Sequence, residues 1–337
     1  MPLSIRVARI FLSLCAVFFV ASSAGAQQQP KWKYFRMGNA ADSTATPRGG
    51  IALMGGGAKQ DPAFQFLCEH ANGGDFLILR ADTEDDYAKQ VNTEINSYCP
   101  LNSVATIVFA GREDSDDPKV VEIINHAETI YFAGGDQSNY VRFWQDTPVQ
   151  DALNRHIAQN RPIGGSSAGL AILGEFSFAS IIDTIHSPDA LANPYGNKVT
   201  LSRDFLRIPL LSDVITDTHF VKRDRLGRTL VFMARILQDD WAKRIREIAV
   251  EENAAVLVEP DGSSTVVGEG PAYFMEANTR PEVCAYKKPL TFKNIAVQRL
   301  APGRTFQLKP WKGNGDNYTL SVVDGKISST SPTHNPY

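Results

Sequence analysis

The five residues Gly165–Gly169, with the sequence GSSAG, have the composition of a nucleophile loop. They follow a short apolar run and precede the apolar stretch Leu170–Leu173, which predicts a tight turn from a strand into a helix. Such a turn strains the backbone of the central serine, and the flanking glycines give it room. The amides at the start of the following helix would lie near the oxyanion of an acyl transfer. The segment favours Ser167 as a nucleophile; the alternative is a turn without chemistry.

A serine hydroxyl needs a base to act as a nucleophile, and histidine is the usual base. The sequence contains six histidines. Four of them lie on predicted helices or in the polar tail, which favours surface or core roles. These are His70, His126, His156 and His334. His186 and His219 fall in predicted loops beyond Ser167, and His219 has the richer polar surroundings. We therefore predict that His219 is the base.

Three arginines follow His219 closely: Arg223, Arg225 and Arg228. A guanidinium binds a carboxylate through two parallel hydrogen bonds, so this cluster predicts capture of a carboxylate-bearing substrate. The alternative is a solvated helix face paired with nearby acids. On one helix, Arg225 and Arg228 would share a face and Arg223 would not. We therefore predict that the helix begins after about residue 224 and that at least two of the three guanidiniums point toward Ser167.

The elements that would position these residues alternate between strands and helices. Short apolar runs that end at glycine or aspartate are typical of buried parallel strands, and they lie at 51–54, 76–79, 104–109, 129–133 and 162–163. Asp117-Pro118 and Thr147-Pro148 are predicted helix starts. The pattern predicts an α/β fold with an open, mostly parallel sheet and helices on both faces. Ligands of such sheets collect at the carboxyl ends of the strands.

Beyond about residue 245 the pattern changes to short strands joined by turns that contain glycine or aspartate, which predicts added C-terminal β strands. The expected organisation has four parts, a signal peptide at 1–26, an N-terminal arm at 27–48, an α/β catalytic domain at 49–275, and a C-terminal β extension with a polar tail at 276–337. Gly55–Gly57 matches no nucleotide-binding spacing, so we interpret it as a strand-end turn in the floor of the site.

The first 26 residues have the features of a secretory signal peptide. Arg6 and Arg9 are their only charges, and the apolar run Ile10–Ala21 is shorter than a membrane span. The small residues 24–26 form a cleavage site, which predicts removal after Ala26. The mature protein is then expected to be secreted or periplasmic and to have no membrane contact. The alternative is a membrane anchor.

Composition and cysteine usage exclude several classes of protein. A formal net charge of -3 argues against a nucleic-acid-binding protein, which is usually strongly basic. After loss of Cys15 with the signal, Cys68, Cys99 and Cys284 remain, an odd number that excludes a disulfide framework. One bridge is compatible with an oxidising compartment, and Cys68–Cys99 is the favoured pair. The cysteines lack metal-ligand spacing, and serine hydrolysis needs no metal and no cofactor.

Four segments, in this order and spacing, resemble the cyanophycinase and peptidase E family of serine peptidases. The segments are Phe132–Gln137 (FAGGDQ), Gly164–Gly169 (GGSSAG), Asp217–Phe220 (DTHF) with the three arginines after it, and Val250–Ala255 (VEENAA), which the family forms as a strand. The resemblance covers roughly residues 50 to 310. It implies a glutamine-amidotransferase-like α/β fold of class I and peptide hydrolysis through an acyl-enzyme. The arginines resemble those of the cyanophycinase branch.

The resemblance also implies a role for each matching residue. Ser167 would be the nucleophile, His219 the general base, and Glu252 the acid that orients the imidazole. The backbone amides of Gly135 and Ala168 would form the oxyanion hole. A further set would contact the substrate or position the site: Gln137, Asp217, Thr218, Arg223, Arg225 and Arg228. The chain order Ser, His, acid differs from that of the α/β-hydrolases.

Two positions depart from the family pattern. Thr218 replaces the family's glutamine and cannot repeat the reach of a side-chain amide. Glu251 replaces an aspartate, which is a milder change. The catalytic pair is unaffected, but the substrate pocket differs from that of the cyanophycinase branch.

The leading hypothesis is an exported, cyanophycinase-like serine exopeptidase that releases β-aspartyl-arginine dipeptides from an aspartate-arginine polymer. The first alternative is a peptidase E-like or isoaspartyl dipeptidase, and the second is a non-catalytic binding protein that retains the fold. The expected partner is a peptide or polyamide rich in Asp and Arg, with no nucleic acid. A homodimer is compatible with the sequence.

Overall fold

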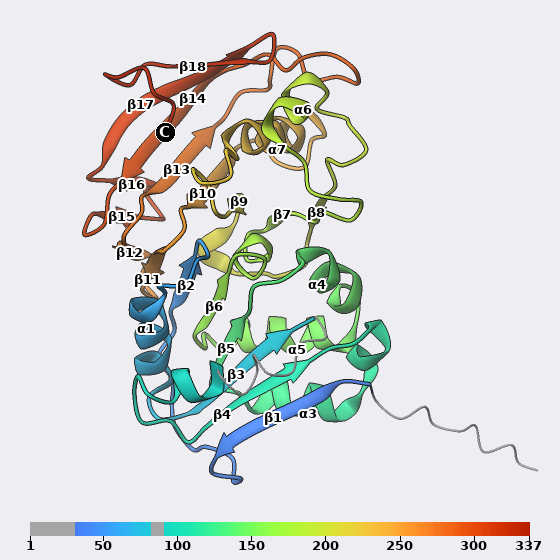
Figure 1. Cartoon of the computed structure of the whole chain (residues 1–337), viewed down its shortest axis with the longest axis vertical. Coiled ribbons are helices and arrows are strands. Elements are labelled where there is room, and N and C mark those ends of the chain that lie inside the picture. Colours follow the sequence, from blue (N-terminus) through green and yellow to red (C-terminus); the bar gives the residue numbers. More distant parts are fainter. Residues whose placement is uncertain (1–30, 82–90) are drawn as a thin grey trace, which may run out of the picture.

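The computed structural model describes residues 31–81 and 91–337. The predicted signal peptide and its cleavage site lie outside these residues. Two sheets build the molecule, with sheet A in the lower part and left side of Figure 1 and sheet B above it. Helices cover both faces of sheet A, so the predicted α/β fold is confirmed, and the added C-terminal strands are present.

Sheet A has ten strands, five of which form its parallel centre. In spatial order they are β1 (Lys33–Gly38), β4 (Ser103–Val108), β3 (Asp75–Arg80), β5 (Thr129–Phe132), β6 (Ile163–Ser166), β2 (Ile51–Met54), β11 (Ala254–Val258), β12 (Ser263–Gly268), β15 (Thr305–Gln307) and β16 (Lys312–Gly313). The parallel strands β4, β3, β5, β6 and β2 lie at the five apolar runs predicted from the sequence, although the runs at 104–109, 129–133 and 162–163 each extend one residue beyond the strand. Because their side chains alternate between faces, each buries residues on both sides.

Four α-helices that lie wholly within residues 31–81 and 91–337 cover the two faces of sheet A. α1 (Asp61–Ala71) packs on one face, and α3 (Pro118–His126), α4 (Gln137–Trp144) and α5 (Pro148–Ala158) pack on the other. Both predicted helix starts are confirmed. The Asp117 carboxylate accepts a hydrogen bond from the Lys119 amide, and the Thr147 hydroxyl accepts one from the Gln150 amide. These caps satisfy amides that the first helical turn leaves without partners.

Sheet B has eight strands and contains most of the C-terminal part of the chain. In spatial order they are β18 (Lys326–Ser329), β17 (Asp316–Val323), β14 (Phe292–Leu300), β13 (Ala272–Ala277), β10 (Ile245–Val250), β9 (Val214–Asp217), β7 (Phe176–Phe178) and β8 (Leu201–Arg203). The helices α6 (Ser187–Ala192) and α7 (Leu226–Gln238) pack on one face. The other face shares a core with sheet A, where Phe274 of β13 stacks on Phe306 of β15 at 3.8 Å between ring centroids.

Three local expectations differ from the structure. Residues 250–255 do not form one strand, because β10 ends in sheet B and β11 begins in sheet A, with a turn between them. The helix expected after Ser167 is a single 3₁₀ turn, η2 (Leu170–Ile172), because the chain turns into β7 soon afterwards. Part of the polar segment 27–48 forms β1, which pairs antiparallel with β4. Two further 3₁₀ turns are η1 (Arg112–Asp116) and η3 (Pro209–Leu211).

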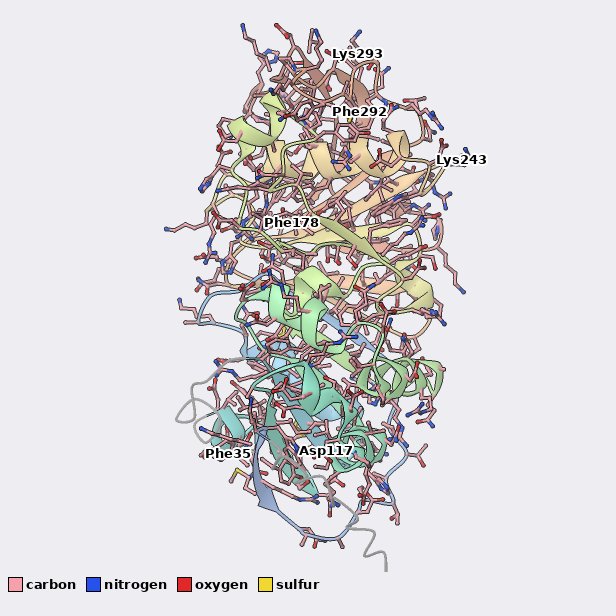
Figure 2. The ribbon with its side chains drawn as sticks, turned by 90° about the vertical axis from the view of Figure 1, so that its right-hand side faces the viewer. Phe35, Asp117, Phe178, Lys243, Phe292 and Lys293 are labelled. Atoms are coloured by element: carbon pink, nitrogen blue, oxygen red, sulfur yellow. A yellow bond between two sulfur atoms is a disulfide. The ribbon has the colours of Figure 1, made fainter. Side chains whose placement is uncertain are left out.

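Figure 2 shows the molecule from the side, with Phe178 of β7 near its middle, Phe35 of β1 toward one end and Phe292 of β14 toward the other. A disulfide joins Cys68 of α1 to Cys99, as favoured from the sequence, and Cys284 is free and buried. Among residues 31–81 and 91–337, the helices are all too short or too polar to cross a bilayer.

Candidate active site

Ser167 lies in the tight turn that the sequence predicts, directly after β6. Its φ of 53° is in the left-handed region, which is costly for a residue with a side chain. The turn requires both flanking glycines. A Cβ at Gly169 would lie 2.1 Å from the Phe132 carbonyl oxygen, and one at Gly165 would lie 2.4 Å from the Gly169 backbone. The Ser167 amide donates to the Met54 carbonyl at 3.1 Å, which fixes the turn to β2.

His219 follows β9 and reaches Ser167 from sheet B. Its Nε2 lies 2.7 Å from the Ser167 hydroxyl oxygen, and its Nδ1 lies 2.6 Å from Oε1 of Glu252. The predicted contacts between these side chains are thus confirmed. Since the Nδ1–H donates to the carboxylate, Nε2 is left to accept the serine proton. The arrangement is that of a nucleophile, a base and an orienting acid.

The glycine-rich turn after β2 forms the floor under the imidazole, as interpreted from the sequence. Gly56 has a φ of +104°, and a Cβ there would lie 2.4 Å from Cε1 of His219. The carbonyl of Gly55 accepts the His219 amide at 2.9 Å, and that of Gly56 accepts the Asn253 amide at 2.7 Å. One turn therefore holds both the loop that carries His219 and the turn that carries Glu252.

The electrostatics keep the imidazole neutral. Burial lowers the pKa of His219 below 6.5, and the positive charges of Arg223 and Arg225 lower it further, against the raising effect of Glu252. The hydrogen bond from His219 lowers the pKa of the Glu252 carboxyl, so that group is ionised. A neutral imidazole beside an ionised carboxylate is the form in which His219 can accept a proton.

We expect the acid limb of kcat/KM against pH to reflect deprotonation of His219 and to have its midpoint below 6.5. Replacing Arg223 by glutamine removes a charge that lowers this pKa, so the limb should move to higher pH. Arg223→Lys keeps the charge and should leave the limb in place. Profiles of the three proteins test this, and an identical limb in the glutamine variant would contradict it.

Two backbone amides beside Ser167 are available to an oxyanion. They belong to Ala168, the next residue, and to Gly135 in the loop after β5. Within residues 31–81 and 91–337, neither amide donates a hydrogen bond. A Cβ on Gly134 would lie 3.7 Å from that of Ser167, so the β5 loop passes close to the serine. The oxyanion hole formed by these two amides stays a prediction.

Asp217 and Arg228 form a buried ion pair behind the loop that carries His219. The Asp217 carboxylate accepts bonds from Nε and Nη2 of Arg228, the first at 2.8 Å, and from the Thr229 hydroxyl at 2.9 Å. The side chains of the pair are 4% and 3% exposed, so neither can meet a substrate. Of the two predicted roles, contact with the substrate or positioning of the site, the geometry favours positioning for both residues. Burial raises the pKa of Asp217, but Arg228 and Arg225 outweigh it and hold the pKa below its usual value.

Arg225 also contacts Asp217, the acid of this ion pair, whereas Arg223 is exposed. Nη1 of Arg225 donates to the hydroxyl and carbonyl of Thr218 at 2.7 and 2.9 Å. Thr218 is itself buried, so its side chain supports Arg225. α7 begins at Leu226, as predicted, and the chain around Arg223 is a turn.

Arg223 and Arg225 line a pocket of about 430 Å³ beside the β5 loop. Its other lining residues are Gly135, Asp136, Gln137, Ser138, Arg142, Ser180, Ile181, Ile182, Asp183 and Thr184. Two of the three predicted arginines thus line one pocket, whereas Arg228 does not. Ser167 is not among its lining residues, so the expectation that two guanidiniums point toward the serine stays a prediction. Sequence reasoning missed Arg142, although it lies one helical turn after Ser138 on α4. It also missed Asp183, for which the sequence carries no comparable signal.

Glu247 of β10 is a further buried acid that sequence reasoning missed. It is fully buried, and burial together with the charge of Asp217 raises its pKa well above the usual value. The pKa values of these two buried carboxyls are thus shifted in opposite directions. Across the described ranges, with their gaps at 1–30 and 82–90, no group of three or more His, Cys, Asp or Glu side chains could hold a metal ion.

Comparisons with known proteins show which family and which fold the chain resembles. Residues 58–200 match the model of peptidase family S51, a span that includes Ser167 and ends before His219. A cyanophycinase from Synechococcus elongatus is 24% identical over 273 residues, which cover 78% of this chain and 80% of the relative. A cyanophycinase from Nostoc sp. is 26% identical over 203 residues, or 58% and 62% of the two chains. The crystal structure of a peptidase from an acI-B1 actinobacterium superposes with a TM-score of 0.53 at 18% identity, over 77% of this chain and 97% of that one, and supports the fold.

Proposed function

Because residues 58–200 match the model of peptidase family S51 and a cyanophycinase is 24% identical over 78% of the chain, we propose that the protein is an exported serine exopeptidase that hydrolyses an aspartate-arginine polymer of the cyanophycin type. The product would be a β-aspartyl-arginine dipeptide. The observation that carries the proposal is the line of hydrogen bonds from Ser167 through His219 to Glu252, at 2.7 and 2.6 Å. Export rests on the sequence features of residues 1–26.

The same line of contacts supports an acyl-enzyme mechanism. Nε2 of His219 takes the hydroxyl proton as the Ser167 oxygen attacks the scissile carbonyl carbon, and Glu252 stabilises the imidazolium. The amides of Gly135 and Ala168 donate to the oxyanion. When the C–N bond breaks, His219 returns the proton to the leaving amine and the acyl group stays on the serine. A water molecule then attacks the ester, His219 takes its proton, and the free carboxylate leaves as Ser167 regains a proton.

The pocket beside the β5 loop supports a substrate that carries carboxylates. Three of its lining residues are arginines: Arg142, Arg223 and Arg225. Arg225 is bonded to its neighbours, whereas Arg223 is exposed and makes no ion pair within the described ranges. A backbone carboxylate of the polymer could accept two parallel hydrogen bonds from the Arg223 guanidinium, which would hold the scissile bond at the serine.

We expect Arg223→Lys to raise KM by roughly tenfold, because an ammonium cannot reproduce a bidentate bond worth about 1.4 kcal/mol or more. Steady-state kinetics on the cleaved substrate provide the measurement. Arg280→Lys is the matched control, since Arg280 pairs with Asp240 on the surface and should tolerate the change. An unchanged KM for Arg223→Lys would remove Arg223 from the substrate contacts and leave the proposed hydrolysis intact.

Thr218 favours a second candidate, a peptidase E-like or isoaspartyl dipeptidase. The threonine supports Arg225 instead of presenting a side-chain amide to the pocket, which departs from the cyanophycinase branch. To separate the candidates, the protein without residues 1–26 is incubated with cyanophycin and with a panel of α- and β-aspartyl dipeptides, and the products are identified by mass. Release of β-aspartyl-arginine from the polymer supports the first candidate, and cleavage of dipeptides alone supports the second. No cleavage of either substrate would favour a non-catalytic binding protein.

A further inference from the structure

The loop Phe220–Arg225, here called the arginine loop, connects His219 to α7 and carries two arginines of the pocket. It is a compact turn, in which the Arg223 amide donates to the His219 carbonyl at 3.0 Å and the Arg225 amide to the Phe220 carbonyl at 2.9 Å. Much of it is exposed to solvent. Its position must therefore be fixed by contacts at its ends and along one side.

Tyr337, the last residue of the sequence, contacts the arginine loop from the polar tail. Its hydroxyl donates to Oδ1 of Asp224 at 2.6 Å and accepts the Leu226 amide at 3.2 Å. Leu226 is the first residue of α7, so its amide has no partner within the helix. Asp224 has a φ of 45°, an unfavourable conformation that outside contacts must hold. One phenol thus binds the loop where its backbone is strained and where the helix begins.

The ring of Tyr337 is held in place from sheet B. It packs edge-on against Phe220 at 5.6 Å and against Tyr273 of β13 at 6.3 Å between ring centroids. The tail before it is also bound, since the Tyr318 hydroxyl of β17 donates to the Pro336 carbonyl at 2.9 Å. Figure 1 places this end of the chain over the strands of sheet B. Tyr337 therefore connects the arginine loop to a rigid sheet.

Other contacts fix the loop independently of Tyr337. The Glu251 carboxylate accepts the amides of Val221 and Lys222, and the Ser187 hydroxyl donates to the Asp224 carbonyl. His219 is held separately, by its hydrogen bonds to Gly55 and Glu252. Loss of the phenol should therefore loosen the Asp224 side chain and the start of α7, on either side of Arg225, without moving the imidazole.

We propose that Tyr337 is a positioning residue for substrate binding, which holds the arginine loop against the pocket. The inference rests on the proposed function, because it assumes that the arginines bind substrate. A loose loop must be ordered when the substrate binds, and that cost weakens binding. The chemical step depends on Ser167, His219 and Glu252 and should keep its rate.

The test compares Tyr337→Phe with the unmodified protein in steady-state kinetics on the cleaved substrate. The phenylalanine keeps the ring contacts and removes both hydrogen bonds, so KM should rise by about three- to tenfold with kcat unchanged. The matched control is Tyr286→Phe, since Tyr286 is 63% exposed and lies far along the sequence from the pocket residues. An unchanged KM, or a loss confined to kcat, would overturn the proposal.

Hydrogen exchange of residues 220–227 gives a readout that needs no activity. In Tyr337→Phe the Leu226 amide loses its acceptor, so exchange in this segment should be faster than in the unmodified protein, while exchange in β6 stays the same. Faster exchange together with failure to cleave any substrate would refute the proposed function and leave the contact between tail and loop standing. Unchanged exchange would refute the positioning role whatever the protein hydrolyses.

Discussion

Ser167→Ala is expected to lower kcat by roughly 10⁴–10⁶-fold, the cost of removing the nucleophile of a triad. The hydroxyl lies 2.7 Å from His219 in a turn whose strained backbone presents it at the end of β6. Within that geometry the alanine removes only one oxygen atom. The fold should survive, since alanine meets the same conformational cost as serine at a φ of 53°. Product formation measured by mass, with circular dichroism as a check of folding, tests the expectation.

Ser166 provides the control for this variant. It is the adjacent serine, at the end of β6, and its hydroxyl has no part in the proposed chemistry. Ser166→Ala should keep most of the activity. If Ser167→Ala stays active, or if the two variants lose activity equally, the nucleophile must be another group.

Asp217→Ala is expected to lower the free energy of unfolding by about 3–5 kcal/mol, the cost of leaving one member of a buried ion pair without its partner. The Arg228 guanidinium is 3% exposed and would lose the carboxylate that it pairs with. Arg225 would lose one of its bonds as well. Urea unfolding followed by circular dichroism measures the change.

Two comparisons separate this effect from the general cost of a substitution. Glu122→Ala removes an exposed ion pair with Lys119 on α3 and should cost less than about 1 kcal/mol. The double variant Asp217→Ala/Arg228→Met removes both charges and should be more stable than Asp217→Ala alone. A single variant as stable as the unmodified protein would mean that the pair contributes nothing to the fold.

The central sheet could be predicted because its strands are continuous apolar runs that end in glycine or aspartate. The runs at 51–54 and 129–133, for example, are β2 and β5. Sheet B could not be assembled in the same way. Its strands come from distant parts of the chain, and β7 and β8 are only three residues long, so their pairing depends on tertiary contacts.

In the candidate site, the loop motif and the nearby histidine were enough to predict that Ser167 and His219 meet. The arginines show the limit of such reasoning. Their spacing predicted the start of α7, but it could not show that Arg228 would be buried against Asp217 while Arg223 remained exposed. Which of the arginines is buried depends on how α7 packs on sheet B. Glu251 is a similar case, since its bonds to the arginine loop arise from the turn between the two sheets.

The three residues of the proposed triad come from different parts of the architecture. Ser167 follows a strand of sheet A, His219 follows a strand of sheet B, and Glu252 lies in the turn that leads from one sheet to the other. The distance between the Ser167 hydroxyl and the His219 imidazole therefore depends on how the two sheets are aligned. A small slip at their shared core, where Phe274 stacks on Phe306, would separate the pair while every strand kept its own hydrogen bonds. Hydrolysis should then fail at denaturant concentrations too low to change the circular dichroism signal of the sheets.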